Sequence, residues 1–192
     1  MTKTTALVFT AALVTGAASA AFAQHDHMAM TGAAATAPVK ARAEITGPGV
    51  SGMADFEEVK TGHLAQVRVR VSVKGLKPGQ HGIHLHAAGK CEPDFTAAGG
   101  HFDPGPFGQM DPDTNHPFHL GDLPNLEVKA DGTGTLDAMT TRVTLSDGPL
   151  SLFDADGTAI IVHGNPDQGV TGEAKSGLSG GPRVACGVVR KP

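Results

Sequence analysis

Residues 66–87, QVRVRVSVKGLKPGQHGIHLHA, carry two strand signals on either side of one turn. The first eight residues, 66–73, alternate polar and apolar side chains with a period of two, which is typical of a half-buried strand. The turn KGLKPGQ follows, and GIHLHA is predicted to be the next strand. The stretch therefore predicts two consecutive β-strands.

Histidines are concentrated in the second of these strands. Residues two apart share one face of a strand, so His84 and His86 should point the same way, with Leu85 on the other side and His81 at the strand entrance. Two imidazoles side by side on a rigid strand form half of a metal site. This pattern alone favours two surface or hydrogen-bonded histidines, so the decision depends on the rest of the chain.

The remainder of the chain shows short alternating runs separated by Gly, Pro, Asp and Asn. Eight runs are predicted as strands: 39–46, 50–59, 63–74, 82–87, 125–130, 134–139, 159–162 and 184–190. Short strands with frequent turns predict an all-β fold, an antiparallel sandwich or barrel. Two long Gly- and Pro-rich segments interrupt them, residues 88–124 and 164–182, and loops of that length are usually functional.

The amino terminus predicts export. Residues 1–23 contain Lys3, a short apolar run and small-residue cleavage sites ending at Ala20 and Ala23, as in a secretory signal peptide. No other stretch is apolar enough to cross a bilayer. The prediction is therefore an exported protein, with the periplasm and the cell exterior both left open.

The segment after the signal peptide, residues 24–38, has little bulky apolar content and is predicted to be a disordered tail. Its HDHMAM sequence leaves open a metal-scavenging role, because imidazole suits copper or zinc and thioether suits Cu(I). Residues 39–192 remain as one domain, long enough for a single core.

Charge and cysteine content limit the partners. Of the 15 Lys and Arg, 14 remain without Lys3, against 19 Asp and Glu, a net charge of −5. A mildly acidic chain argues against nucleic acid or an anionic membrane as partner. In an oxidising compartment the two cysteines, Cys91 and Cys186, can pair. The oligomeric state stays open, a homodimer included.

The two long segments contain or adjoin most of the remaining chemistry. The first carries a histidine in GGHFDPG and two histidines and an aspartate in NHPFHLGDLPN, while the strand AIIVHGN ends on a histidine at the second. These residues are His101, His116, His119, Asp122 and His163. Together with the histidines of the strand 82–87, they outweigh a reading as scattered structural histidines.

The motifs HGIHLHAAGKC, AGGHFDP, HLGDLPN, VHGNPD and GGPRVACGVV, in this order, resemble those of the copper–zinc superoxide dismutase family. The resemblance covers about residues 39–189. It implies a flattened eight-stranded Greek-key β-barrel with the metals outside it, under the two long loops. It also implies dismutation of the superoxide anion to dioxygen and hydrogen peroxide.

The resemblance also implies roles for individual residues. Copper would be bound by His84, His86, His101 and His163, and zinc by His101, His116, His119 and Asp122. His101 would bridge the two metals and serve as proton donor, and Arg183 would be the active-site arginine that attracts the anion. Asp167 would link a copper ligand to a zinc ligand, and Cys91 and Cys186 would form the intrachain disulfide.

One zinc ligand departs from the family pattern. The family usually places its third zinc histidine in the first half of the segment before the HxGD motif, yet here GPFGQMDPDTN, residues 105–115, has no histidine. We predict that His116 takes this place through a rearranged loop. The rival interpretation is a copper-only or weak zinc site with His116 facing solvent.

Two other functions compete with the enzyme. An exported copper or zinc carrier without turnover would explain the histidines, but not an arginine beside the copper site or a bridging histidine. A structural sandwich module with a decayed site is disfavoured by the intact copper set.

Overall fold

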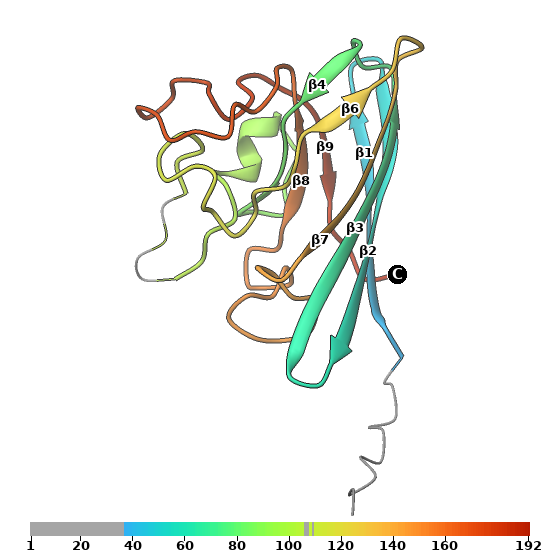
Figure 1. Cartoon of the computed structure of the whole chain (residues 1–192), viewed down its shortest axis with the longest axis vertical. Helices are drawn as coiled ribbons and strands as arrows, with labels where there is room; N and C mark the ends of the chain where they lie inside the picture. The colour runs from blue at the N-terminus through green and yellow to red at the C-terminus, as the bar shows by residue number, and fades with distance from the viewer. Residues whose placement is uncertain (1–36, 106–107, 109) are drawn as a thin grey trace, which may run out of the picture. The chain divides into compact units, whose positions relative to one another are not determined.

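Three long strands make the first part of a curled sheet. In the computed structural model, which describes residues 37–105, 108 and 110–192, they are β1 (Val39–Gly47), β2 (Val50–Thr61) and β3 (Leu64–Lys74), joined as antiparallel hairpins (Figure 1). Four valines of β3, at 67, 69, 71 and 73, are buried, while Arg68 and Arg70 between them are exposed. The period-two prediction for residues 66–73 is confirmed.

The remaining strands extend this sheet on both sides. They are β4 (Gly79–His81), β5 (Ile83–His86), β6 (Leu126–Val128), β7 (Thr133–Thr140), β8 (Ala159–His163) and β9 (Arg183–Val188). Among the described residues the sheet has nine strands in the order β4-β6-β7-β3-β2-β1-β9-β8-β5, with every pair antiparallel. Only Gly82 separates the two edge strands, β4 and β5, in the chain, so the sheet curls almost into a closed barrel. The all-β barrel prediction is confirmed.

The inner face of the barrel holds the main core. Apolar side chains from β1, β2, β3, β5, β6, β8 and β9 meet there, with Phe56, Ile45, Leu85 and Ile160 among the largest that are fully buried. Burying side chains of this size stabilises the fold by about 1.5–3 kcal/mol each. This core gives the site a rigid wall.

Two strands are buried on both faces, because the long loops cover their outer side. All residues of β5 and of β8 are buried. Ile83 and Leu85 of β5 point into the main core, while a second cluster of Ala98, Ala159, Ile161 and Cys186 lies under the first loop, residues 88–124. In Figure 1 this loop and the second loop, residues 164–182, gather on the side away from β2 and β3.

The structure differs from the sequence prediction in two short elements. β4 was expected to be part of a turn, but its three residues pair with β6. A 3-10 helix, Phe95–Ala98, lies in the first loop, where no helix was expected. Both are too short for periodicity to reveal.

Two of the predicted segments consist of residues that the structure does not describe. The predicted signal peptide, residues 1–23, and the HDHMAM segment lie outside the described residues. Within the part of the chain that is described, no helix has the length and apolar character needed to cross a bilayer.

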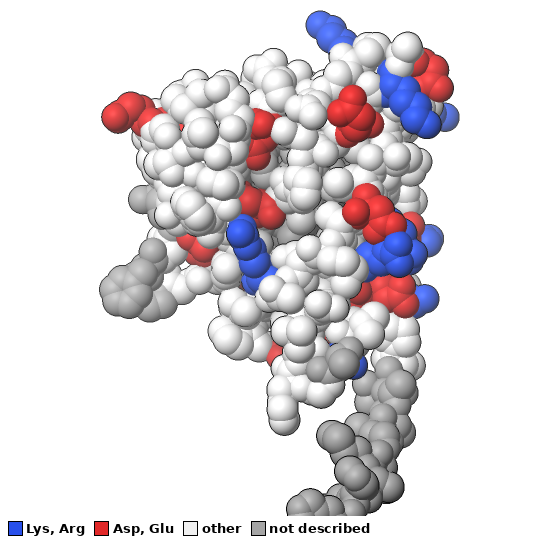
Figure 2. Space-filling model, in the orientation of Figure 1, with Lys and Arg blue, Asp and Glu red and all other residues white. Residues whose placement is uncertain are grey.

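The outward face of β1, β2, β3 and β7 carries paired charges. The cross-strand ion pairs are Arg42–Asp55, Arg70–Glu57 and Arg68–Asp137, the first at 2.9 Å and the second at 3.2 Å. Figure 2 shows blue and red side chains interleaved on the right-hand side of the view. Exposed pairs of this kind contribute about 0–1 kcal/mol each.

Candidate metal centre

Four histidines from two strands and the first loop converge outside the barrel. They are His84, His86, His101 and His163, and one ring nitrogen of each lies within 4.8 Å of the others. β5 supplies the first two because residues two apart share its outer face. His163 ends β8, the strand paired with β5, and His101 forms an isolated bridge with His86. The site is therefore built on the rigid edge of the sheet.

Each of these rings is held by its other nitrogen. His86 Nδ1 donates to the carbonyl of Gly99 and His163 Nδ1 donates to that of Gly181, both at 3.0 Å. His84 Nε2 lies 3.1 Å from Asp167. An acceptor on one nitrogen fixes the proton there and leaves the lone pair on the other.

The nitrogens that remain are aimed at a common space. His84 Nδ1, His86 Nε2, His101 Nε2 and His163 Nε2 are buried and have no hydrogen-bond partner. Leaving a buried polar atom unpaired costs about 1–3 kcal/mol, which four neighbouring rings would not do by chance. The arrangement fits a metal ion that takes imidazole ligands, copper included.

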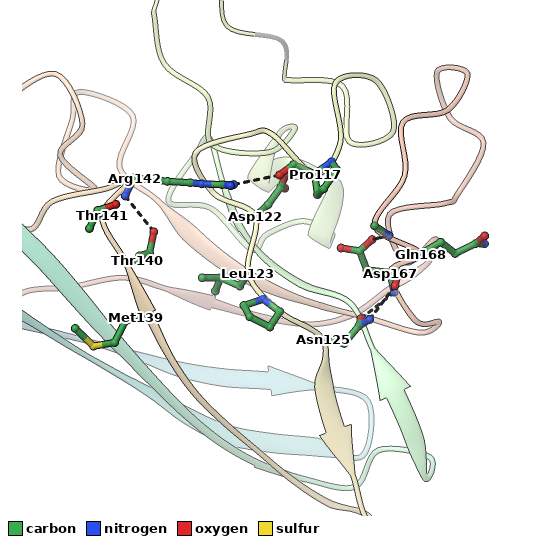
Figure 3. Close-up of a pocket in the computed structure, with 12 residues that line it drawn as sticks. Pro117, Asp122, Leu123, Asn125, Met139, Thr140, Thr141, Arg142, Asp167 and Gln168 are labelled. Atoms are coloured by element: carbon green, nitrogen blue, oxygen red, sulfur yellow. Dashed lines mark hydrogen bonds between the residues drawn. The ribbon is translucent and has the colours of Figure 1, made fainter.

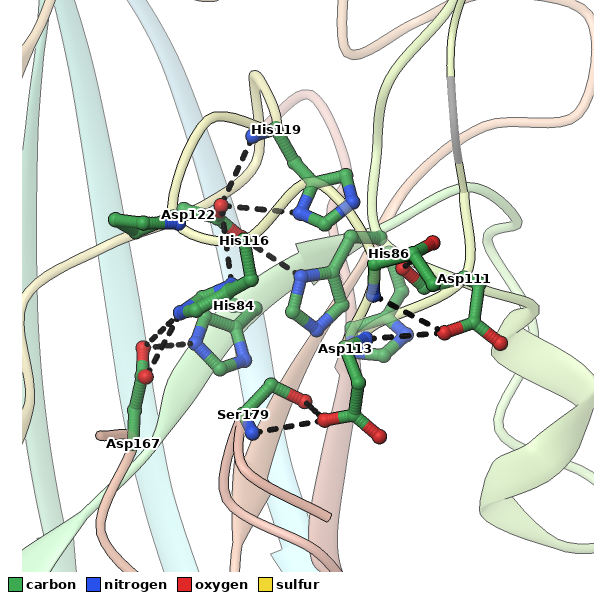
Figure 4. A network of polar contacts seen from close by, with 12 residues as sticks. His84, His86, Asp111, Asp113, His116, His119, Asp122, Asp167 and Ser179 are labelled. Carbon is green, nitrogen blue, oxygen red and sulfur yellow. Dashed lines mark hydrogen bonds and ion pairs between the residues drawn. The ribbon is translucent and has the colours of Figure 1, made fainter. Parts of the chain in front are cut away.

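A second group lies beside the first and shares His101 with it. His101, His116, His119 and Asp122 each offer an atom within 4.8 Å of the others. The Nδ1 atom lies 2.7 Å from an Asp122 oxygen in His101, 3.2 Å in His116 and 3.1 Å in His119. The contact of His116 lacks hydrogen-bond geometry. Figure 4 shows His116 and His119 on either side of Asp122. Three imidazoles and one carboxylate fit tetrahedral zinc.

His116 is fully buried, at 0% exposure, so the solvent-facing interpretation of this residue is wrong. Only two residues separate it from His119 in the chain, and the first loop places both rings against the same carboxylate, Asp122. Its Nε2 lies 2.7 Å from Asp167 Oδ1, and its Nδ1 is left unpaired. The ring therefore spans from Asp167 to the group around Asp122.

The protonation state of three of the rings suits metal binding, while that of His116 opposes it. Burial lowers the pKa of His86 and His163 far below the usual range, and burial together with the nearby His84 and His119 lowers the pKa of His101 to about 3. These three rings are neutral at pH 7, as metal ligands must be. Burial opposes charge on His116 too, but Asp122 and Asp167 outweigh it and raise the pKa of His116 to about 9. A zinc ion would compete with that proton.

Asp167 connects the two groups. Its carboxylate lies 3.1 Å from His84 Nε2 and 2.7 Å from His116 Nε2. Burial favours its neutral form, yet the hydrogen bonds of both rings hold its pKa below the usual range. Asn125 fixes its backbone, since the side-chain amide donates to the Asp167 carbonyl and accepts from the Asp167 N–H. Sequence reasoning missed Asn125.

Arg183, at the start of β9, lies near the four-histidine group. It donates to the carbonyls of Phe95 and Gly99 at 2.7 and 2.6 Å, which ties the guanidinium to the first loop. Arg183, Lys175 and His163 line one pocket of about 420 Å³. Burial lowers the pKa of Arg183, but an arginine remains charged at neutral pH. The pocket thus brings His163 together with two cationic side chains.

A second pocket, of about 600 Å³, adjoins the Asp122 group. Asp122, Asp167, Asn125 and Arg142 are among its lining residues (Figure 3). Arg142 donates to the carbonyls of Pro117 and His119, both at 3.1 Å. It holds the loop segment that carries the second histidine group, and no sequence pattern singles it out.

The predicted disulfide is confirmed. Cys91 and Cys186 are bonded, with Cα atoms 5.8 Å apart, and they close a loop with a sequence separation of 95. Cys186 lies in β9, so the bond fastens the first loop to the same strand that carries Arg183.

Comparisons with known proteins agree with this geometry. Residues 50–189 match the family model described as "Copper/zinc superoxide dismutase (SODC)". A "Superoxide dismutase [Cu-Zn]" of Caulobacter vibrioides is 41% identical over 130 residues, covering 65% of this chain and 71% of the relative. A protein of the same name from Deinococcus radiodurans is 39% identical over 150 residues, with coverage of 72% and 76%.

A solved structure is also similar. The crystal structure of the clock protein EA4 aligns with a TM-score of 0.66 and 28% sequence identity, covering 82% of this chain and 97% of that protein. Since the family match spans most of the chain and includes every strand that carries the two histidine groups, the chain belongs to the copper/zinc superoxide dismutase family.

Proposed function

We propose that the protein catalyses the dismutation of superoxide, in which two superoxide anions and two protons give dioxygen and hydrogen peroxide. The observation that carries this function is the pocket in which Arg183 and Lys175 adjoin His163 of the four-histidine group. A small anion entering it meets these cationic side chains next to the His163 ring, whose Nε2 is buried without a hydrogen-bond partner.

The assignment of the metals follows from the donor atoms. His84, His86, His101 and His163 would bind copper, and His101, His116, His119 and Asp122 would bind zinc. When bound, copper supplies one-electron exchange with the substrate, and zinc supplies a fixed positive charge. Asp167 and the carbonyls of Gly99 and Gly181 orient the rings.

Two residues have direct roles in the reaction. Arg183 attracts the anion and holds it by hydrogen bonds in the pocket. His101 belongs to both groups and offers Nε2 as the atom that carries and releases a proton. Its Nδ1 stays directed at Asp122, which keeps the ring in place while the proton moves.

The alternative is an exported copper or zinc carrier without turnover. Superoxide consumption by the metal-loaded protein separates the two functions: an enzyme accelerates the decay by orders of magnitude over the buffer, while a carrier leaves it near the uncatalysed rate. Pulse radiolysis with the loaded and the metal-free protein measures this directly.

Reversal of the charge at Arg183 should slow the reaction strongly. We expect Arg183→Glu to reduce the rate about 10-fold or more, because the substrate is an anion and local positive charge raises its capture by about 10–10³-fold. Copper content should stay the same, since Arg183 does not belong to the four-histidine group. The measurement is the rate constant as a function of ionic strength.

Arg183→Lys is the matched variant for this test. It keeps the point charge and loses the planar donor pair, so its rate should fall less than that of the Glu variant. A wild-type rate and salt dependence in Arg183→Glu would show that this side chain does not guide the substrate.

Removal of the His116 ring should release zinc and spare copper. The ring is one of the four donors of the Asp122 group. Among the described residues it belongs to one further set, with His84 and Asp167, and not to the four-histidine group. Altering groups that merely orient a ligand weakens metal binding about 10–100-fold, so loss of the ligand itself in His116→Ala should weaken zinc at least that much. Metal content by mass spectrometry checks this.

His63→Ala is the control, because His63 is an exposed histidine in the turn between β2 and β3. It removes one imidazole without touching either group. Unchanged zinc stoichiometry in His116→Ala would refute the zinc assignment of this residue.

The proposal extends to where the protein works. A disulfide that closes 95 residues is typical of exported proteins, and it supports the predicted signal peptide, residues 1–23. We infer a periplasmic or extracellular protein whose partner is a small anion, with neither nucleic acid nor a membrane as partner.

A further inference from the structure

Asp113 is a buried carboxylate that the reaction above does not use. It lies in the first loop, in the segment where the family histidine is missing, and only 3% of it is exposed. An aspartate is seldom buried unless its oxygens are satisfied. The hydrogen-bond donors to this carboxylate therefore indicate its structural role.

Among the described residues, the groups that donate to it belong to the second loop. Ser179 donates to Asp113 Oδ1 through its N–H at 2.9 Å and through its hydroxyl at 2.8 Å (Figure 4). Gly177 N–H donates to Asp113 Oδ2 at 2.8 Å. Gly172 N–H donates to the Asp113 carbonyl, also at 2.8 Å. One residue of the first loop thus accepts four hydrogen bonds from the second.

The segment held in this way leads directly to the four-histidine group. Gly180 follows Ser179 with φ +113°, and a Cβ there would lie 2.7 Å from the Cβ of His163, so the backbone packs against that ring. Gly181 then accepts the Nδ1 hydrogen bond of His163. Arg183 begins β9 two residues later.

We propose that Asp113 is a positioning residue: by holding Gly177 and Ser179 it fixes the segment that orients His163 and the approach to Arg183. The proposal rests on the proposed function for its effect on rate, but its structural part does not. Asp113, Lys175, His163 and Arg183 line the same pocket, so movement of the held segment would change the pocket itself.

Two roles of Asp113, as a negative charge or as a positioning group, predict opposite changes in the rate when the carboxylate is neutralised. If Asp113 acted only as a negative charge in the wall of an anion pocket, its neutralisation would raise the rate. If it acts by position, Asp113→Asn lowers the rate, because the amide keeps one acceptor and turns an NH₂ group toward a backbone donor. We expect a several-fold slower rate.

The test combines the rate with two other measurements on the full-length protein. Amide hydrogen exchange at Gly177 or Ser179, whichever N–H then faces the NH₂ group, should be about 10-fold faster or more in Asp113→Asn, as expected for loss of a hydrogen bond to a charged acceptor. The electron paramagnetic resonance spectrum of the copper-loaded variant should differ from wild type, at equal copper content. Asp147→Asn, which removes one exposed carboxylate outside both loops, is the control and should change none of these.

Ser179→Ala keeps the test decisive if Asp113→Asn does not fold. It removes only the hydroxyl bond and leaves the charge, and it should change exchange and rate in the same direction by a smaller amount. The proposal would be overturned if Asp113→Asn had wild-type hydrogen exchange and a wild-type copper spectrum. A rate of Asp113→Asn that equals or exceeds the wild-type rate would overturn it as well. If wild type itself consumes no superoxide, the proposed function fails, while exchange and the copper spectrum still decide the role of Asp113.

Discussion

Replacing His163 with alanine should abolish superoxide consumption while the barrel stays folded. The ring belongs to the four-histidine group and lines the pocket that contains Arg183. Changes that only disturb the orientation of a ligand already weaken metal binding about 10–100-fold, and this change removes the donor itself. His163 ends β8 outside the main core, so the far-ultraviolet circular dichroism spectrum should match that of wild type.

The measurements are copper content and the rate of superoxide decay. His63→Ala, which also removes one imidazole, should retain both. Full activity in a folded, copper-assayed His163→Ala protein would show that the four-histidine group is not the reaction centre.

Loss of the disulfide should produce the largest change in stability. Replacement of Cys91 and Cys186 together by serine reopens a loop with a sequence separation of 95, and closing a loop of that length stabilises the folded state by about 4–5 kcal/mol in the chain-entropy model. The free energy of unfolding, from guanidinium titration at fixed metal content, should fall by about this amount.

The rate should fall as well, for a local reason. The disulfide and the two hydrogen bonds from Arg183 to Phe95 and Gly99 fasten the same part of the first loop to β9. Without the disulfide, the segment keeps the hydrogen bonds of Arg183 and His86 and the packing of Ala98, but it loses its covalent link to β9. A loss of stability below about 1 kcal/mol would contradict the loop-closure argument.

The barrel could be predicted from local patterns, and its exceptions have physical reasons. The alternation in residues 66–73 reflects one buried and one exposed face, so period two was enough to find β3. β5 and β8 are buried on both faces, which hides the alternation and which only the covering loops explain. β4 could not be recognised because Pro78, just before it, and Gly79, its first residue, are typical of turns.

The sequence predicted the metal-binding residues of the candidate site more completely than the residues that hold the loops in place. His-x-His in a strand and the family motifs identified most ligands of both groups. His116 was then predicted as the missing zinc ligand because it is the one further histidine of the first loop. Asp113 and Arg142 were missed because they act through backbone groups of residues distant in the chain. Asp113 lies in an Asp-Pro-Asp sequence, which locally indicates only a turn.

The paired charges on the outer face of the sheet determine what an approaching anion senses at a distance. Arg42, Arg68 and Arg70 are matched there by Asp55, Glu57 and Asp137. Beyond the Debye length, about 8–10 Å at physiological salt, the three positive and three negative charges of these pairs cancel, so the ion-paired residues neither attract nor repel superoxide. The salt dependence of substrate capture therefore reports on charges outside these three pairs, among them Arg183 and Lys175 at the pocket beside His163.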